Sequence, residues 1–322
     1  MPELITLASA QIEVDVDLGP GADIVGLRDR ASGIDVLFRT PWHEHAQAVR
    51  EGRAARVAFD PVGGALESYR GGWQLLFPVA GPPRAIHGAP TTFHGEAEDA
   101  TWTLVDHDGA SARLAVELFT VPVRIERSLE VAGARLTISD TLTNLSVVPL
   151  QVDYVSHPAF AGLFLDGEVV LDTNAAAYTA DPDTEGSLVP AGSTHAWPHA
   201  GTTDLRVLPP TGIPRTAFGA LSGFPATGAW ASFTNVESGL SVRLAWDPAD
   251  LPYAWFWQEL HFTEGFPWHR RARVAAIEPA STTTGGPDRA SALTIPPMGR
   301  REISHSVTLH HTTSNEDSEE MS

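Results

Sequence analysis

The chain has 322 residues, no cysteine and no lysine, and its 40 acidic against 21 basic residues give a formal net charge of −19. The missing thiols exclude disulfides, a cysteine nucleophile and thiolate zinc sites, and the missing lysines exclude a Schiff base, a pyridoxal-phosphate anchor and a Walker A loop. The acidity argues against nucleic acid as a partner, because affinity for a phosphate backbone rests on clustered basic side chains.

The first residues, MPELITLASAQIEV, do not combine a basic stretch with an apolar one, as a secretory signal would. No segment approaches the roughly 18 apolar residues that cross a bilayer. We therefore expect a cytoplasmic protein that does not bind a membrane.

Alternation of apolar and polar residues dominates the pattern, and period two is typical of half-buried strands. A single short helix is expected over Glu44–Ala58. The alternating runs are Leu114–Leu118, Val123–Ile125, Leu136–Ile138 and Val242–Trp246. Turn signals that predict antiparallel hairpins lie at Asp106–Gly109, Ala132–Gly133, Asp166–Gly167 and Glu237–Gly239. With 28 Gly, 25 Pro and no long helical periodicity, the sequence predicts an all-β fold, a large antiparallel β-sandwich with few short helices.

The interpretation of the domain organisation depends on the proline-rich segment 178–228, whose pattern predicts a loop. Such a segment is either a long surface excursion or a domain boundary. Strand patterns resume at Trp230 without a change in composition. We therefore expect one domain over residues 1–311, followed by a disordered acidic tail over residues 312–322.

Three segments place ionisable groups beside glycine, proline and aromatic residues, where strands end and loops begin. The first, residues 69–102, offers Arg70, Trp73, Gln74, His94 and Glu96. The second, residues 153–164, offers Asp153, Tyr154 and His157. The third, residues 251–281, offers Trp255, Trp257, Gln258, Glu259 and Glu278.

These residue types suit a small sugar as the partner. A sugar ring presents apolar C–H faces to tryptophan and a rim of hydroxyls to planar polar side chains. One histidine with one glutamate supplies an acid and a base that work near neutral pH.

Four motifs in order resemble the aldose 1-epimerase (galactose mutarotase-like) superfamily. They are GADIVGLRDRASGIDVLFRTP, then GGWQLLFP with FHGEAEDATW, then SHPAFAGLF, and finally LPYAWFWQE with AAIEPAS. The resemblance covers the chain to about His311, and it implies the galactose mutarotase-like supersandwich, a β-sandwich of about this length.

The resemblance also implies roles for individual residues. His157 would be the general acid and Glu278 the general base of a reaction that opens the sugar ring and recloses it on the other face, with no cofactor. Arg70 and His94 would bind substrate hydroxyls, and Trp73, Gln74 and Trp257 complete the expected sugar site. The family's further substrate-binding aspartate would fall within residues 178–228, where the sequence singles out none.

Alternatives remain open at this point. A non-catalytic carbohydrate-binding protein would keep the aromatic and polar contacts without both proton-transfer groups. A glycosidase or lyase-like enzyme would pair Glu278 with a second carboxylate such as Glu96 or Glu259. A phosphorylated sugar would need at least two converging arginines, for which Arg70 and Arg84 are available. No metal site is expected, since a solvated loop explains His43-Glu44-His45 better than a ligand pair.

Overall fold

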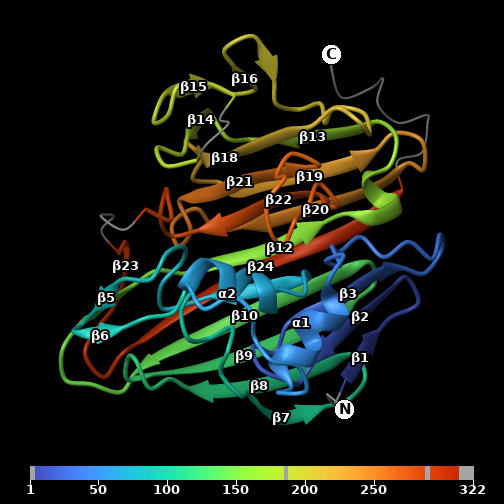
Figure 1. Cartoon of the computed structure of the whole chain (residues 1–322). Coiled ribbons are helices and arrows are strands. Elements are labelled where there is room, and N and C mark those ends of the chain that lie inside the picture. The colour runs from blue at the N-terminus through green and yellow to red at the C-terminus, as the bar shows by residue number, and fades with distance from the viewer. Residues whose placement is uncertain (1–3, 185–187, 287–290, 312–322) are drawn as a thin grey trace.

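The computed structural model describes residues 4–184, 188–286 and 291–311, which form two large antiparallel sheets packed as a sandwich (Figure 1). The larger sheet has ten strands, in the order β1 (Leu4–Ala8), β2 (Ile12–Asp17), β3 (Ile24–Asp29), β4 (Trp73–Leu76), β12 (Val155–Phe160), β22 (Arg273–Ala280), β21 (Tyr253–Leu260), β18 (Arg215–Ser222), β14 (Ala177–Ala180) and β15 (Thr194–Ala196). The prediction of an all-β sandwich is confirmed.

The second sheet has eight strands, in the order β13 (Val169–Thr173), β19 (Ala229–Asn235), β20 (Leu240–Trp246), β24 (Arg300–His311), β10 (Arg135–Asn144), β9 (Val123–Ala132), β8 (Ser111–Glu117) and β7 (Thr103–His107). Three two-stranded ribbons complete the described strands: β5 (Ala85–Ile86) with β6 (Ala89–Pro90), β11 (Leu150–Val152) with β23 (Leu293–Ile295), and β16 (His199–Ala200) with β17 (Thr203–Asp204).

The alternating runs form strands as expected, because one side of each strand faces the core between the sheets. In β9 every second residue is buried, from Val123 through Ile125 to Val131. Three predicted hairpins join β7 to β8, β9 to β10 and β19 to β20. The fourth prediction is wrong, because Asp166–Gly167 links the 3₁₀ turn η1 (Gly162–Leu165) to β13 rather than two paired strands.

The helix predicted over Glu44–Ala58 is shorter than expected, and a second helix follows beyond its predicted end. Helix α1 covers His43–Arg50 and ends before Gly52, whose positive φ of 68° suits glycine. Helix α2 covers Pro61–Ser68. The Asp60 side chain caps α2 by accepting a hydrogen bond from the Gly63 N–H at 2.8 Å. None of the helices in the described ranges is long and apolar enough to cross a membrane.

The segment 178–228 is not a plain surface loop, because it supplies β15 and β18 and the end of β14 to the larger sheet. Its apolar residues Leu205, Leu208 and Leu221 are buried in the same core as both sheets. The tail predicted to be disordered, residues 312–322, lies outside the described residues.

Candidate active site

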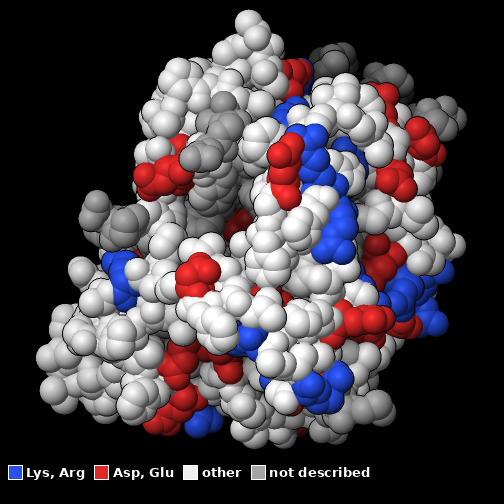
Figure 2. Space-filling model, in the orientation of Figure 1, with Lys and Arg blue, Asp and Glu red and all other residues white. Residues whose placement is uncertain are grey.

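A pocket of about 510 Å³ lies on the face of the larger sheet that points away from the second sheet. Helix α2 and the loops around residues 81–98 and 181–184 form its walls, and Figure 2 shows this face of the molecule hollowed. Four neighbouring strands, β21, β22, β12 and β4, supply the central part of its lining.

One row of side chains crosses these four strands. Trp255 pairs with Glu278 in the β21–β22 register, and His157 pairs with Gln74 in the β12–β4 register. The β12–β22 register places His157 opposite Glu278. Because paired residues in antiparallel strands point to the same face, all four side chains line the pocket. The sheet thus brings together two residues that lie far apart in the sequence.

His157 and Glu278 form the closest titratable pair in this row. His157 Nε2 lies 3.5 Å from Glu278 Oε1. The other atoms of the pair, His157 Nδ1 and Glu278 Oε2, are buried and have no hydrogen-bond partner among the described residues. Buried polar atoms are normally satisfied, so two orphaned atoms in one pocket indicate a place for a polar ligand.

Burial shifts both pKa values away from the charged forms. Removal from water raises the pKa of Glu278 well above its usual value of 4.5 and lowers the pKa of His157 from 6.5 to about 4. Burial therefore favours the uncharged forms of both groups, in which the one proton of the pair is on Glu278, and transfer of that proton to His157 gives a carboxylate and an imidazolium. A pair that holds one proton can give and take protons without a net change of charge.

Three of the other predicted sugar-site residues line the same pocket: Gln74, His94 and Trp257. The Gly81 N–H donates to His94 Nδ1 at 3.0 Å, which leaves the proton of a neutral His94 on Nε2. The rings of His94 and Trp257 lie 6.0 Å and 5.8 Å from the ring of His157. These residues surround the pair with donors and with an aromatic surface.

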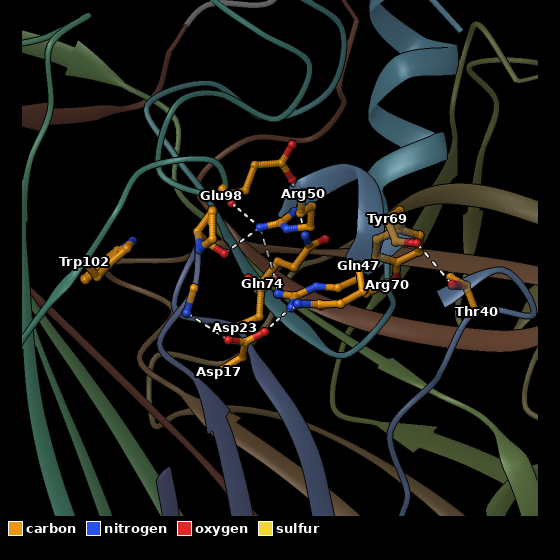
Figure 3. Close-up of polar contacts among 12 residues, drawn as sticks. Asp17, Asp23, Thr40, Gln47, Arg50, Tyr69, Arg70, Gln74, Glu98 and Trp102 are labelled. Atoms are coloured by element: carbon orange, nitrogen blue, oxygen red, sulfur yellow. Dashed lines mark hydrogen bonds and ion pairs between the residues drawn. The ribbon is translucent and has the colours of Figure 1, made fainter. Parts of the chain in front are cut away.

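Arg70 and Trp73 do not line the pocket, contrary to the expectation for sugar contacts. Arg70 is buried and forms ion pairs with Asp17 and, at 2.8 Å, with Asp23, as Figure 3 shows. The charge of Arg70 is therefore neutralised by these two carboxylates, and its side chain does not contact the pocket. Trp73 alternates with Gln74 along β4, so its ring faces the core, where Nε1 donates to Ser156 Oγ at 2.7 Å.

The two carboxylates named for the glycosidase or lyase-like alternative do not reach the pocket. Glu96 accepts hydrogen bonds from Phe119 and Thr120, and Glu259 from Phe262 and Thr263; neither lines the pocket. Among the described residues no three potential metal ligands cluster.

His43 and His45 lie on α1 rather than in the predicted loop, and His45 contacts Glu67 at 2.8 Å. Arg84 contacts Asp153 at 3.0 Å.

Sequence reasoning missed several pocket residues. They are Arg50, Tyr69, Glu98, Asp181, Asp183 and Trp268. Glu98 follows His94 by four residues, but nothing in the pattern marks which acid of that loop turns inward. Asp181 and Asp183 lie in the segment where an acidic substrate contact was expected and could not be placed.

Glu98 is a second buried carboxyl in the pocket. Its Oε2 accepts a hydrogen bond from Gln74 Nε2 at 3.4 Å, which links it to the row of His157 and Glu278. Burial and the nearby charge of Asp99 raise the pKa of Glu98 well above its usual value, although Arg50 lowers it in part. A protonated Glu98 can donate a hydrogen bond as well as accept one.

Two glycines set the rim of the pocket by direct backbone contact. A Cβ added to Gly81 would lie 2.6 Å from the Gly285 Cα atom, and one added to Gly285 would lie 3.2 Å from the Gly81 Cα atom. Gly81 also has a positive φ of 84°. The two loops can meet this closely only because neither position carries a side chain.

Comparison of the sequence with known proteins finds no matching family model and no matching curated protein. The fold, in contrast, is shared with solved structures. The Slr1438 protein from Synechocystis sp. PCC 6803 aligns with a TM-score of 0.69 at 16% identity, over 97% of each chain.

Two further solved structures carry enzyme names. The GalM/aldose epimerase homologue from C. elegans aligns with a TM-score of 0.67 at 15% identity, over 97% of this chain and 100% of that one. The galactose mutarotase related enzyme from Lactobacillus acidophilus aligns with a TM-score of 0.65 at 15% identity, over 97% and 99%. These alignments cover nearly the whole chain, and the chain therefore has the galactose mutarotase-like β-sandwich fold.

Proposed function

We propose that this protein is an aldose 1-epimerase-like isomerase that interconverts the α and β anomers of a small sugar. The observation that carries the proposal is the His157–Glu278 pair, 3.5 Å apart in a pocket of about 510 Å³. This volume lies within the range of small-molecule sites. The names of the C. elegans and Lactobacillus acidophilus neighbours support the same reaction class.

The chemistry needs two proton transfers. With the one proton of the pair on His157 rather than on Glu278, Glu278 takes the proton of the anomeric hydroxyl while His157 protonates the ring oxygen, and the bond between the ring oxygen and the anomeric carbon breaks to give the open aldehyde. The aldehyde group rotates, and reclosure reverses both transfers with the hydroxyl on the other face. No proton is consumed, and positioned acid–base groups of this kind contribute about 10²–10⁴-fold each.

The protonation state of the pair sets the pH range of activity. Each group accepts and donates a proton once in a full interconversion, so the pair needs one proton in total. Below about pH 4 His157 also becomes protonated, and no base remains. Above the raised pKa of Glu278 the shared proton is lost, and no acid remains. We therefore expect a bell-shaped profile.

The remaining pocket side chains suit sugar binding. Trp257 and Trp268 offer aromatic surface, with ring centroids 5.9 Å apart. Gln74, His94 and Glu98 offer donors and acceptors to hydroxyls.

A phosphorylated sugar fits less well. Arg50 is the one arginine or lysine among the described lining residues. Its guanidinium already donates to the Glu98 backbone oxygen at 2.7 Å and lies 3.7 Å from Asp23. Two free converging arginines, which a phosphate group would require, are not available in the described lining. An uncharged aldose is therefore the substrate class we propose.

The direct test is anomer exchange measured by NMR or polarimetry on freshly dissolved pure anomers of a panel of aldoses. Wild-type protein is expected to accelerate equilibration for at least one sugar. Glu278→Gln and His157→Ala should each remove most of the acceleration, whereas Glu130→Gln, an exposed change on β9, should not.

If no aldose equilibrates faster with the protein, or if both pocket variants retain the full rate, the proposal is wrong. Saturable binding of a sugar without any acceleration would instead identify a carbohydrate-binding protein.

A further inference from the structure

Three buried hydrogen-bond donors without partners lie on the three strands β18, β21 and β22. They are Arg215 Nη2, Gln258 Nε2 and Arg273 Nη1, and the described residues offer none of them an acceptor. Buried donors are almost always paired, so an orphaned group calls for a cause such as a missing ion. Here three occur together, and none belongs to the proposed sugar pocket.

The strand register places these groups side by side. Arg215 pairs with Leu260 on β21, and Leu260 pairs with Arg273 on β22, so both arginines point to one face of the sheet with one strand between them. Arg215 Nε donates to Gln258 Oε1 at 2.7 Å, which turns the Gln258 amide nitrogen toward the same region. We call these three residues the arginine cluster.

The cluster lies on the other face of strands that line the pocket. Thr216, Trp257 and Glu278 point into the pocket from β18, β21 and β22. The arginine cluster points toward the second sheet, where the neighbouring Leu260 belongs to the core. Arg215 and Arg273 are half-buried, so the cluster sits at the rim of the sandwich, within reach of solvent.

The charges of the cluster are not balanced. Neither arginine forms an ion pair with a carboxylate in the described parts of the chain. Within the described residues, Arg273 donates to backbone oxygens, those of Leu165 at 3.2 Å and Pro209 at 2.9 Å.

Burial, and then the neighbouring charge of Arg273, lower the pKa of Arg215 from 12.5 to about 10. Asp166 acts on Arg273, and Tyr178 on Arg215, only through longer-range electrostatics. Two like charges held together in a protein this acidic require a compensating group.

We propose that the arginine cluster is a binding site for a small oxyanion, with Arg215, Gln258 and Arg273 as its donors. A set of donors without acceptors matches the oxygens of phosphate, sulfate or a carboxylate group, and the planar guanidinium is the side chain best suited to them. A bound anion would join β18 to β22 across β21 and hold the loop at Pro209 against them. Its occupancy would thus brace the strands that line the pocket.

The test is thermal unfolding of the full chain in low-millimolar phosphate, sulfate or acetate, each compared with sodium chloride at equal ionic strength. Low concentrations avoid the general stabilisation that sulfate and phosphate give every protein. We expect at least one oxyanion to raise the unfolding midpoint saturably, by about 2–4 °C at ten times its dissociation constant. The anion that does so identifies the preferred chemistry.

Substitution separates the cluster from nonspecific effects. Arg215→Gln and Arg273→Gln should abolish the rise. Without anion, the removed repulsion acts against the loss of the hydrogen bonds from Arg215 to Gln258 or from Arg273 to backbone oxygens. Arg124→Gln makes the same charge change on an exposed residue of β9 and should retain the full rise.

The proposal is overturned if no oxyanion exceeds chloride, or if the two cluster variants show the wild-type rise. If a glutamine variant does not fold, isothermal titration of wild-type protein and Arg215→Lys decides. Lysine lacks the planar fork, so binding should weaken about tenfold or more, and equal binding contradicts the proposed site.

Discussion

Strand β12 separates two polar regions that differ in one respect, the pairing of their charges. Ser156 points between the sheets, where it joins a cluster that we call the inner network: Trp73, Arg127, Asp140, Tyr154, Ser156 and His305. The next residue, His157, points to the other face and into the pocket. Both regions are buried, and each contains a histidine whose pKa burial lowers to about 4.

The inner network pairs its charges, although His305 Nδ1 has no hydrogen-bond partner among the described residues. Arg127 binds both oxygens of Asp140, at 2.8 Å and 2.7 Å, and the Tyr154 hydroxyl donates to the same carboxylate at 2.8 Å. The charge of Arg127 keeps the pKa of Asp140 below its usual value despite burial. A bidentate pair with a third donor satisfies the carboxylate almost completely, so these residues hold the sheets together.

The pocket pair has no such compensation. Burial is the cause that shifts the pKa of Glu278, and within the described residues no arginine forms an ion pair with it. The comparison teaches that burial alone does not distinguish a structural polar group from one available for chemistry. The distinction lies in whether the charge of a buried carboxylate is balanced by a cation of the protein, as for Asp140, or is not, as for Glu278.

The largest expected effect is on catalysis. Glu278→Gln should lower kcat/KM for anomer exchange by about 10²–10⁴-fold, because the amide cannot accept the anomeric proton. Its unfolding midpoint at pH 8 should stay the same or rise, since a buried carboxyl without a cation is removed. NMR measures the rate of anomer exchange and thermal unfolding measures the stability of the variant. A large loss of stability would instead indicate that Glu278 has a structural role, as Asp140 does.

Next in size is a change in the inner network. Arg127→Met should destabilise the fold by about 3–5 kcal/mol, because Asp140 would remain buried without its cation. Urea unfolding measures the change, with the exposed Arg124→Met as the control. At temperatures where the variant is folded, its rate of anomer exchange per folded molecule should match that of wild-type protein. A loss of this rate would contradict the view that the inner network is structural and the pocket pair catalytic.

The pH dependence of stability tests the two buried histidines, His157 in the pocket and His305 in the inner network. Between pH 6.5 and about 4 the unfolded chain protonates His157 while the folded chain does not, so stability falls as pH falls through this window. The full contribution is about 3 kcal/mol. His157→Gln should flatten this part of the curve measured by urea unfolding at a series of pH values.

We expect His305→Gln to change the pH dependence of stability as His157→Gln does, but to leave anomer exchange intact. The pKa of His305 is lowered in the same direction, so His305→Gln should also flatten the curve, with a lower baseline because the bond to Ser156 at 2.8 Å is lost. Only His157→Gln should abolish anomer exchange. Equal losses of exchange in the two variants would contradict a catalytic role specific to the pocket.

The smallest expected effect is that of replacing Trp257, an aromatic residue of the pocket lining. Trp257→Ala should raise KM by about 3–10-fold through lost stacking, with kcat changed less, since an aromatic contact contributes about 0.5–1.5 kcal/mol. Trp102, buried at the edge of the core outside the pocket, provides the contrast: Trp102→Phe should change stability and leave KM unaltered. Steady-state kinetics on the preferred sugar separates the two.

The strand pattern predicted the sandwich because alternation reports directly on a half-buried surface. Alternation also states that Trp73 and Gln74 face opposite ways, but it does not say which one faces the pocket. That choice depends on packing between the sheets, where Trp73 meets Ser156. His157 and Glu278 were predicted as the proton-transfer pair from ordered motifs, and their convergence follows from a register that no local pattern encodes.

The misplaced role of Arg70 and the missed residue Glu98 have related physical origins. Arg70 finds its carboxylates 53 and 47 positions away in the sequence, at Asp17 and Asp23, so its partners emerge only when β2 and β3 pack beside β4. Glu98 turns into the pocket because of a loop conformation. Long-range pairing and loop geometry leave little trace in a single sequence.

The contact between Gly81 and Gly285 is a point on the pocket rim where a single substitution can change the width of the pocket. Gly285 does not have a positive φ, and an alanine there needs its neighbours to give way by only a few tenths of an ångström. Alanine at Gly81 would instead meet backbone in a conformation unsuited to it. Variation of sugar preference, in nature or by directed evolution, is therefore expected to pass through Gly285 while Gly81 stays invariant.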